Sequence, residues 1–268
     1  MSDPGKKPQP PNNTESIPVL KIGEAGRSRA VQTVAREFML TIFLKDKELV
    51  TIMCSPENMR ELAAGFLFSE GLIRSKADIK KLDIDEWLGT ARVETTGDSA
   101  ADSRFFSKRL LASGCGGSAT FYDVSDAAAL KIESGVTIAA GVVARLANAF
   151  QHRSELYRAT HGVHSAALSE GDKMIVFYED IGRHNAVDKI FGRCLLEDIP
   201  TKDRIIVTSG RVSSEILQKV VKRGIPVIVS ISAPTDLGVK IADKLGVTLI
   251  GLVRGGNMNV YTHEERVT

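Results

Sequence analysis

Three apolar segments alternate with helical segments in the C-terminal half of the chain, and this alternation constrains the fold more than any other feature. The apolar segments are RIIVTS (204–209), PVIVSIS (226–232) and VTLIGLV (247–253), with predicted helices at 213–223 and 234–245 between them. Strands that are apolar along their whole length are typical of a sheet covered by helices on both faces. The pattern predicts an α/β domain with a parallel or mixed sheet.

The segment before these strands extends the same domain. HSAALS (164–169) and KMIVFY (173–178) flank the polar turn EGD and predict a hairpin, and a helix is expected from about residue 182. The order helix, hairpin, helix and then alternating strands and helices resembles the cytidine-deaminase-like fold. We therefore predict a three-layer domain of this kind over 126–268, with a helix at 138–154 that joins it to a preceding lobe.

The preceding part of the chain predicts a smaller α+β lobe over 18–125. Segment 36–54 alternates around the charged break KDKE and predicts a hairpin, and Ser55 and Pro56 are expected to open a helix. The buried stripe expected for that helix comprises Met59, Leu62, Ala63, Phe66 and Leu67.

The N-terminal residues 1–17 are predicted to form a disordered tail. The stretch MSDPGKKPQPPNNTES holds four prolines and no apolar run, so it does not resemble an export signal. No later stretch supplies the roughly eighteen apolar residues of a membrane span. With 35 basic and 33 acidic residues, the net charge of +2 gives no electrostatic reason to expect nucleic acid or an anionic membrane as a partner. A cytoplasmic protein is the expectation.

The three cysteines, at 54, 115 and 194, are too few for a disulfide framework or a thiolate metal cage. Cys54 ends the apolar strand LVTIMC and Cys194 falls on an apolar helical repeat, so both are predicted to be buried. Cys115 instead stands among three glycines in SGCGG. Glycine lets another molecule approach the backbone closely, so this thiol is predicted to meet a partner.

The predicted fold allows a test for zinc chemistry. Zinc deaminases place a histidine and a glutamate after the hairpin, and a Pro-Cys-x-x-Cys turn at the start of the next helix. Here those places read IGRHNAV and TSGRVSSEI, so only His184 matches. We therefore predict no zinc and no other metal site, and a ligand crevice at the carboxyl ends of the strands.

Four polar segments are candidates for the wall of that crevice. EDIGRHNAVDK (179–189) crowds charges at the entry to a helix, where anions bind. TSGRVSSE and VRGGNMNVY each follow a strand and combine glycine with arginine, a composition that can hold phosphates; the residues concerned are Ser209, Gly210, Arg211 and 254–257. THGVHSAAL carries His161 and His164, for which a structural role is favoured and a role in a cleft is left open.

The chain as a whole resembles the formate dehydrogenase accessory sulfurtransferase family, often called FdhD. The resemblance covers about residues 25–267 and rests on GFLFSEGLI, SGCGG, THGVHSAAL, EDIGRHNAVDKIFG, TSGRVSSE and the segment 224–263, in that order. EDIGRHNAVDK is its most specific part. The resemblance implies a cytoplasmic sulfur carrier, with Cys115 accepting persulfide sulfur from a cysteine desulfurase and passing it to the molybdenum cofactor of formate dehydrogenase.

The resemblance also implies binding of bis-molybdopterin guanine dinucleotide through Leu252, Val253, Arg254, Gly255, Gly256 and Asn257. Members of this family commonly carry Cys-Gly-x-Cys-Gly at the thiol loop, whereas Ser118 replaces the second cysteine here. A carrier with one thiol is therefore expected. The alternative is a non-catalytic chaperone that binds the cofactor or the apo-enzyme and has lost sulfur transfer. A homodimer is also left open.

Overall fold

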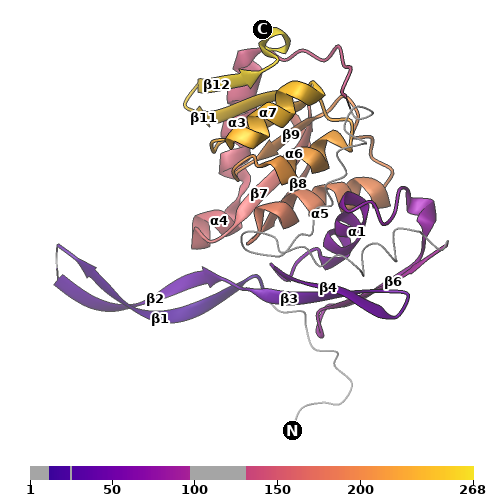
Figure 1. The fold of residues 1–268 in the computed structure, drawn as a ribbon. Coiled ribbons are helices and arrows are strands. Elements are labelled where there is room, and N and C mark those ends of the chain that lie inside the picture. The colour runs from indigo at the N-terminus through magenta and orange to yellow at the C-terminus, as the bar shows by residue number, and fades with distance from the viewer. Residues whose placement is uncertain (1–11, 25, 97–130) are drawn as a thin grey trace.

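The computed structural model describes residues 12–24, 26–96 and 131–268, and Cys115 lies outside them. The described residues form a mixed α/β fold with six helices and three sheets (Figure 1). No helix in this part of the chain is long and apolar enough to cross a membrane.

The six-stranded sheet forms the centre of the C-terminal domain, with the strand order β12-β11-β10-β9-β7-β8. Its strands are β7 (His164–Glu170), β8 (Lys173–Asp180), β9 (Ile205–Thr208), β10 (Val227–Ser230), β11 (Thr248–Arg254) and β12 (Asn257–Thr262). Strands β9, β10 and β11 are parallel, whereas β7 is antiparallel to β9 and β12 to β11. The predicted mixed sheet is confirmed.

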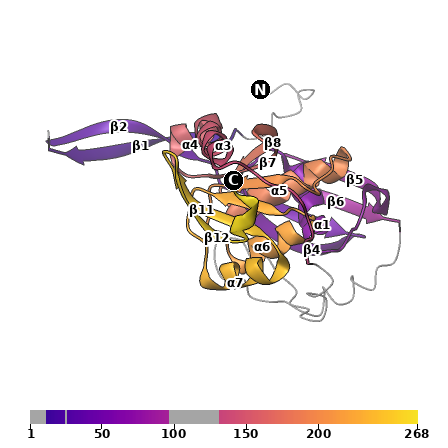
Figure 2. The same cartoon turned by 90° about the horizontal axis from the view of Figure 1, so that it is seen from above.

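Helices cover both faces of this sheet (Figures 1 and 2). One face packs against α5 (Arg183–Leu196), α6 (Ser214–Val221) and α7 (Asp236–Leu245), and the other against α3 (Ala140–Arg153). The sheet is apolar on both sides, as in Ile206 and Val207 of β9, which face opposite cores. The stretch 138–154, predicted to join two lobes, is therefore a layer of the domain. The short helix α4 (Glu155–Thr160) follows it.

The N-terminal lobe is a four-stranded sheet covered by one helix. Its strand order is β4-β3-β6-β5, from β3 (Phe38–Leu44), β4 (Lys47–Cys54), β5 (Ile79–Asp85) and β6 (Thr90–Thr95). The predicted hairpin of β3 and β4 and the predicted buried stripe of the helix are both confirmed. That helix, α1 (Met59–Ser69), begins later than predicted. A capping box over Ser75–Asp78 encloses a single 3-10 turn, Lys76–Asp78, before β5.

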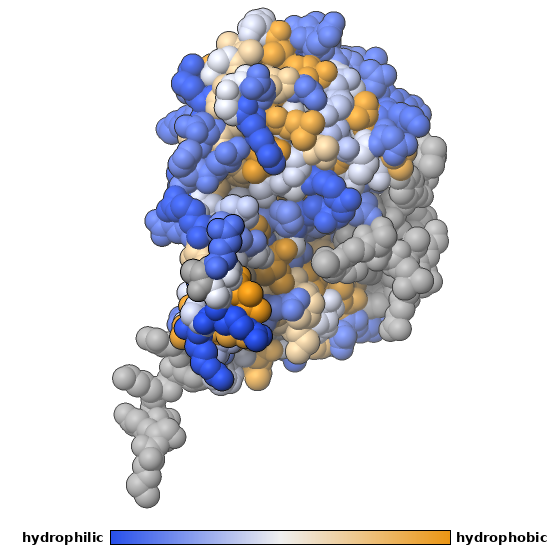
Figure 3. Space-filling model, turned by 90° about the vertical axis from the view of Figure 1, so that its left-hand side faces the viewer, coloured by the Kyte–Doolittle hydropathy of each residue, from blue (hydrophilic) through white to orange (hydrophobic). Residues whose placement is uncertain are grey.

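A two-stranded ribbon precedes this lobe and projects from the body of the protein (Figure 1). It consists of β1 (Thr14–Gly23) and β2 (Gly26–Ala35), paired antiparallel. The prediction of a disordered tail over 1–17 is wrong for residues 14–17, because they pair with β2. Leu20, Ile22 and Val31 are exposed on the ribbon, and Figure 3 shows apolar residues beside strongly hydrophilic ones there. No apolar side chain of the ribbon is buried. The alternation of buried and exposed residues that usually indicates a strand is therefore weak in this segment.

Helices α1 and α5 join the lobe to the domain by direct backbone contact. A Cβ at Gly65 would lie 1.8 Å from the carbonyl oxygen of Asp188, and one at Gly192 would lie 1.9 Å from that of Glu61. The two glycines therefore face each other across the crossing, where no side chain fits between the helices. Both residues are buried, and the cores of the lobe and the domain meet on either side of them.

The more specific cytidine-deaminase-like description stays a prediction. The sequence predicted a loop after β11, but the chain there continues into strand β12. The segment VRGGNMNVY therefore contains the end of β11, a turn and most of β12, which pairs with β11 as a hairpin.

Replacing Gly65 by alanine is expected to destabilise the protein by about 1 to 3 kcal/mol or more, because the added methyl group meets backbone that cannot rotate away. Gly141→Ala is the matched control, since a Cβ in this exposed position of α3 meets only the end of the Arg145 side chain at 3.6 Å. It should be neutral or stabilising by up to about 1 kcal/mol. Urea unfolding of both variants measures this; equal midpoints would contradict the close crossing.

Candidate functional site

The two cysteines that the structure describes are both buried in apolar cores. Cys54 is fully buried and Cys194 is 3% exposed, as predicted. Burial raises the pKa of each thiol to about 12. A thiol must lose its proton to act as a nucleophile, so neither residue is suited to accept sulfur near neutral pH.

The segment EDIGRHNAVDK, predicted as the wall of a ligand site, forms hydrogen bonds between the domain and the lobe. Asp180 at the end of β8 and Lys189 in α5 form a fully buried ion pair with an Oδ2 to Nζ distance of 2.7 Å. Asp180 also accepts hydrogen bonds from the backbone N–H of Ser55 in the lobe and from the side chain of Asn185. The Asn185 amide in turn donates to the carbonyl of Met53 at 2.8 Å. These groups satisfy one another, as a buried charge requires.

A second buried polar cluster lies where the end of α1 meets α6. Asp188 accepts hydrogen bonds from Ser69 Oγ at 2.6 Å and from Lys219 Nζ at 2.5 Å. Burial raises the pKa of Asp188, against the opposing effect of Lys219. Lys222 and Arg223 donate to the last carbonyls of α1, those of Ser69 and Phe68. The cationic end of α6 thus caps the negative end of the α1 dipole.

Glu70 lies within this second cluster. Its Oε1 is buried, has no hydrogen-bond donor and lies 3.9 Å from Lys219 Nζ. Burial raises its pKa to about 7, while Lys219 and Lys222 act to lower it and Asp188 and Glu215 act to raise it further.

His184, which the sequence analysis compared with the histidine of zinc deaminases, lies in α5 and faces Glu215 of α6. Its Nε2 is 3.0 Å from Oε2 of Glu215, without the alignment of a hydrogen bond. Burial lowers its pKa to about 3, so the ring is neutral. Among the residues that the structure describes, no group of three or more His, Cys, Asp or Glu side chains could hold a metal ion.

A cleft of about 880 Å³ opens at the carboxyl edge of the six-stranded sheet. Because β9 and β11 are parallel, their ends bring Ser209 and Arg254 to this edge. Because β7 runs the opposite way, its first residue, His164, lies there too. Arg158 and His161, from α4 and the residue after it, add basic side chains to the lining. Among the described residues of the lining none is Asp or Glu, so the cleft suits an anion.

Hydrogen bonds connect the loops at this edge. Ser232 Oγ donates to the carbonyl of Ser209, and Ser230 Oγ donates to that of Gly210. The backbone N–H of Leu252 donates to the carbonyl of Ser232. The ends of β9, β10 and β11 therefore hold Ser209 in a fixed position at the cleft.

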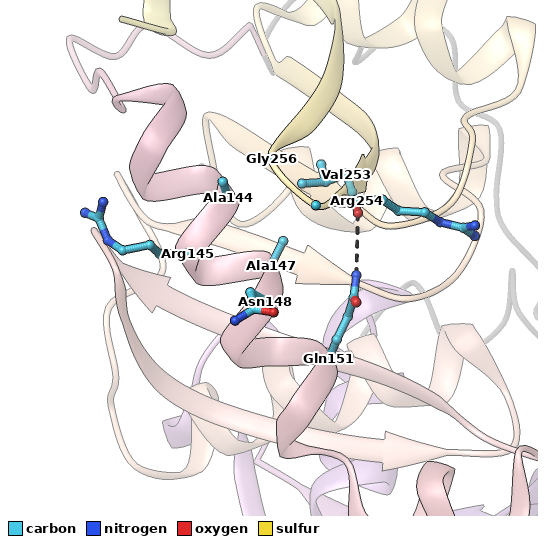
Figure 4. A pocket seen from close by; sticks show the side chains of 9 residues that line it. Ala144, Arg145, Ala147, Asn148, Gln151, Val253, Arg254 and Gly256 are labelled. Atoms are coloured by element: carbon cyan, nitrogen blue, oxygen red, sulfur yellow. Dashed lines mark hydrogen bonds between the residues drawn. The ribbon is translucent and has the colours of Figure 1, made fainter.

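The segment 252–257 forms the turn of the hairpin between β11 and β12. An irregularity between Gly251 and Arg254, with Leu252 at φ 55°, turns Val253 into the core and leaves Leu252 exposed. Gly255 and Gly256 have positive φ and make the turn, and Asn257 pairs with Arg254. A smaller pocket lies between this turn and α3, where Gln151 donates to the Val253 carbonyl (Figure 4). Arg254 lines both the pocket and the cleft.

The structure thus brings together some of the candidate residues and separates others. Ser209 and Arg254 share the cleft, whereas His184 faces α6 and the side chain of Val253 is buried in the core. Gly210 packs against Arg183, beside the cleft. His161 and His164, for which a structural role was favoured, both line the cleft. The antiparallel pairing of β7 with β9 places the start of β7 beside the end of β9, and the hairpin predicted at 164–178 did not by itself indicate that neighbour.

These features define a class of protein: a two-lobed α/β protein with a basic cleft at the edge of its sheet and a polar junction between its lobes. The chain matches the FdhD/NarQ family over residues 35–268 and belongs to it. It is 44% identical to the sulfur carrier protein FdhD of Bacillus pumilus, over 88% of this chain and 90% of that protein. It is 46% identical to the sulfur carrier protein FdhD of Geobacillus kaustophilus, over 87% of this chain and 89% of that protein.

The fold has a relative among solved structures. A crystal structure from Desulfotalea psychrophila, described as that of a formate dehydrogenase accessory protein, superposes with a TM-score of 0.79 at 26% identity. The superposition covers 96% of this chain and 100% of the other.

Glu70→Gln is expected to remove a pH dependence of stability. A carboxyl whose pKa is higher in the folded than in the unfolded protein stabilises the fold below its ordinary pKa of 4.5, and that contribution is lost as the pH rises through 7. The variant should therefore gain stability over the native protein between pH 5 and pH 8, by about 3 kcal/mol at most. Urea unfolding at both pH values measures this gain. Glu57→Gln, an exposed carboxylate before α1, is the control, and the prediction fails if the two variants respond alike to pH.

Proposed function

We propose that this chain is a sulfur carrier that supports the maturation of formate dehydrogenase. The observation that carries the proposal is the 44–46% identity, over most of the chain, to relatives named sulfur carrier protein FdhD. The structural relative described as a formate dehydrogenase accessory protein supports the same role. The client is then a formate dehydrogenase, and the cytoplasm, where thiols stay reduced, is the compartment that suits the free thiols Cys54 and Cys194.

Cys115 is the sulfur acceptor in this proposal. Its thiolate attacks the outer sulfur of a persulfide on a cysteine desulfurase, a Cys115–S–SH persulfide forms, and the desulfurase cysteine leaves as its thiolate. No electrons are gained or lost overall in this exchange. The raised pKa values of the buried Cys54 and Cys194 support the assignment, because they leave Cys115 as the thiol suited to this reaction. With Ser118 in place of a second cysteine, one thiol carries the sulfur.

The cargo cofactor, bis-molybdopterin guanine dinucleotide, binds through its guanine nucleotide phosphates at the cleft. Arg254 offers a guanidinium, His161 and Arg158 add further basic groups, and Ser209 is held rigidly beside them. The residues present fit a phosphorylated ligand, because the described lining contains several basic side chains and no carboxylate to repel it. The volume of about 880 Å³ suits a ligand of nucleotide size. When bound, the cofactor supplies the metal that receives the sulfur.

Cys115→Ser is expected to abolish sulfur loading with little loss of stability. After incubation with a cysteine desulfurase and cysteine, the native protein should gain one or more increments of about 32 Da, the mass of a sulfur atom, and the variant should gain none. Intact-protein mass spectrometry under non-reducing conditions measures this.

The controls for loading are Cys54→Ala and Cys194→Ala. Each should still gain sulfur, but each should be less stable because a buried side chain is removed. A sulfur adduct that persists in Cys115→Ser and supports transfer would refute the assignment. An unloaded native protein that still binds the cofactor would favour the non-catalytic chaperone.

Arg254→Ala is expected to weaken the binding of guanosine diphosphate, used as a stand-in for the nucleotide part of the cofactor, by about 1.5 to 3 kcal/mol. The loss corresponds to one charge-assisted hydrogen bond. Arg145→Ala is the matched control, because Arg145 lines only the smaller pocket beside α3. Calorimetric titration of the three proteins measures the effect. Equal affinities for native protein and Arg254→Ala would show that the hairpin turn between β11 and β12 is not part of the binding site.

A further inference from the structure

His164 is held at the cleft by one particular partner. Its Nδ1 lies 3.2 Å from the hydroxyl oxygen of Ser209. The same oxygen accepts the backbone N–H of Ser165 at 2.9 Å, and the backbone N–H of Ser209 donates to the carbonyl of Ser165 at 3.0 Å. Two residues at the start of β7 and one after β9 therefore fix both the ring and the hydroxyl that contacts it.

The position of the protons follows from satisfying these groups. The Ser209 hydroxyl already accepts the N–H of Ser165, and among the described residues His164 Nδ1 is the only hydrogen-bond partner that could take its proton. If Nδ1 carried a proton instead, that hydroxyl proton would have no acceptor in the described part of the chain. The arrangement that satisfies every group has Nδ1 as acceptor and the ring proton on Nε2.

The free side of the ring belongs to the cleft. Nε2 has no hydrogen-bond partner among the described residues, and His164 is part of the cleft lining together with Ser209 and Arg254. We propose that His164 is a neutral hydrogen-bond donor of the cleft, oriented by Ser209, and that its Nε2–H binds a phosphate oxygen of the nucleotide. This inference rests on the proposed function, since it names a contact made by the proposed cargo.

The charges around the ring favour the neutral form. Burial lowers the pKa of His164, and Arg183 at the start of α5 and Arg211 after β9 lower it further, while Asp180 at the end of β8 acts in the opposite direction. His184 also interacts with His164, and burial lowers the pKa of His184 to about 3, so it is itself neutral. In this proposal His164 donates a hydrogen bond to the phosphate from a neutral N–H group, whereas Arg254 supplies the positive charge.

The first test reads the ring directly in the ligand-free protein. Nitrogen NMR of histidine-labelled protein, with the signal assigned by its loss in His164→Gln, should show a protonated Nε2 and an unprotonated Nδ1 at pH 7. In a titration, the pKa of the ring should lie below the ordinary histidine value of about 6.5. A proton on Nδ1, or a charged ring at pH 7, would overturn the proposal whatever the protein binds.

The second test measures the affinity for guanosine diphosphate. His164→Leu should lose about tenfold to a hundredfold, the effect of one hydrogen bond to a charged group. His164→Gln, whose amide can place an N–H near the position of Nε2, should recover most of that loss. The ratio of affinities between native protein and His164→Leu should be the same at pH 7.5 and pH 8.5, because both lie above the ordinary histidine pKa of about 6.5 and the pKa of His164 is lower still.

His152→Gln is the matched control. It removes an imidazole from the same cleft, at an exposed position of α3 where the ring contacts the Asn148 carbonyl of its own helix, and it leaves the contact between His164 and Ser209 intact. Equal losses in His152→Gln and His164→Leu would show a general effect of cleft imidazoles and overturn the proposal. Unchanged affinity in His164→Leu would overturn this inference alone, whereas a native protein that does not bind guanosine diphosphate would overturn the nucleotide site and this inference together.

Discussion

The contact between the backbones of α1 and α5 is the constraint on which the rest of the structure depends. Gly65 and Gly192 face each other so closely that a Cβ on either would overlap a carbonyl of the opposite helix. This approach brings the end of α1 within hydrogen-bond distance of Asp188, and the lobe strand β4 to Asp180 and Asn185. A wider crossing would leave these buried polar groups unpaired, at a cost of several kcal/mol for each charge.

The same constraint connects the lobe junction to the cleft. The segment EDIGRHNAVDK begins at the end of β8 and continues into α5. It contains both members of the ion pair between Asp180 and Lys189. It also contains Arg183, which contacts Gly210 beside the cleft. Sulfur loading and cofactor binding use different parts of the chain in the proposed function. One continuous segment therefore contributes to both the lobe junction and the edge of the cleft.

Much of the fold could be predicted from the sequence because its central strands are continuously apolar and its helices keep a regular apolar stripe. The ribbon of β1 and β2 could not be predicted, since it buries no apolar side chain. Strand β12 was not predicted because the residues after Arg254 are mostly polar. The composition of EDIGRHNAVDK could not distinguish a buried ion pair from the wall of a ligand site, because both need dense charge. The tertiary contact between Asp180 and Lys189 shows that this segment contains a buried ion pair. Ser209 and Arg254 were predicted to lie on one edge and do share a cleft.

The central claim is that a sulfur carrier of this family holds a guanine-containing cofactor at the cleft. The most direct measurement is to purify the full chain from cells that synthesise bis-molybdopterin guanine dinucleotide and to identify what is released on denaturation by mass spectrometry. The claim predicts guanine nucleotide and pterin released together, in near-stoichiometric amount. A folded protein from the same cells that releases neither would contradict it.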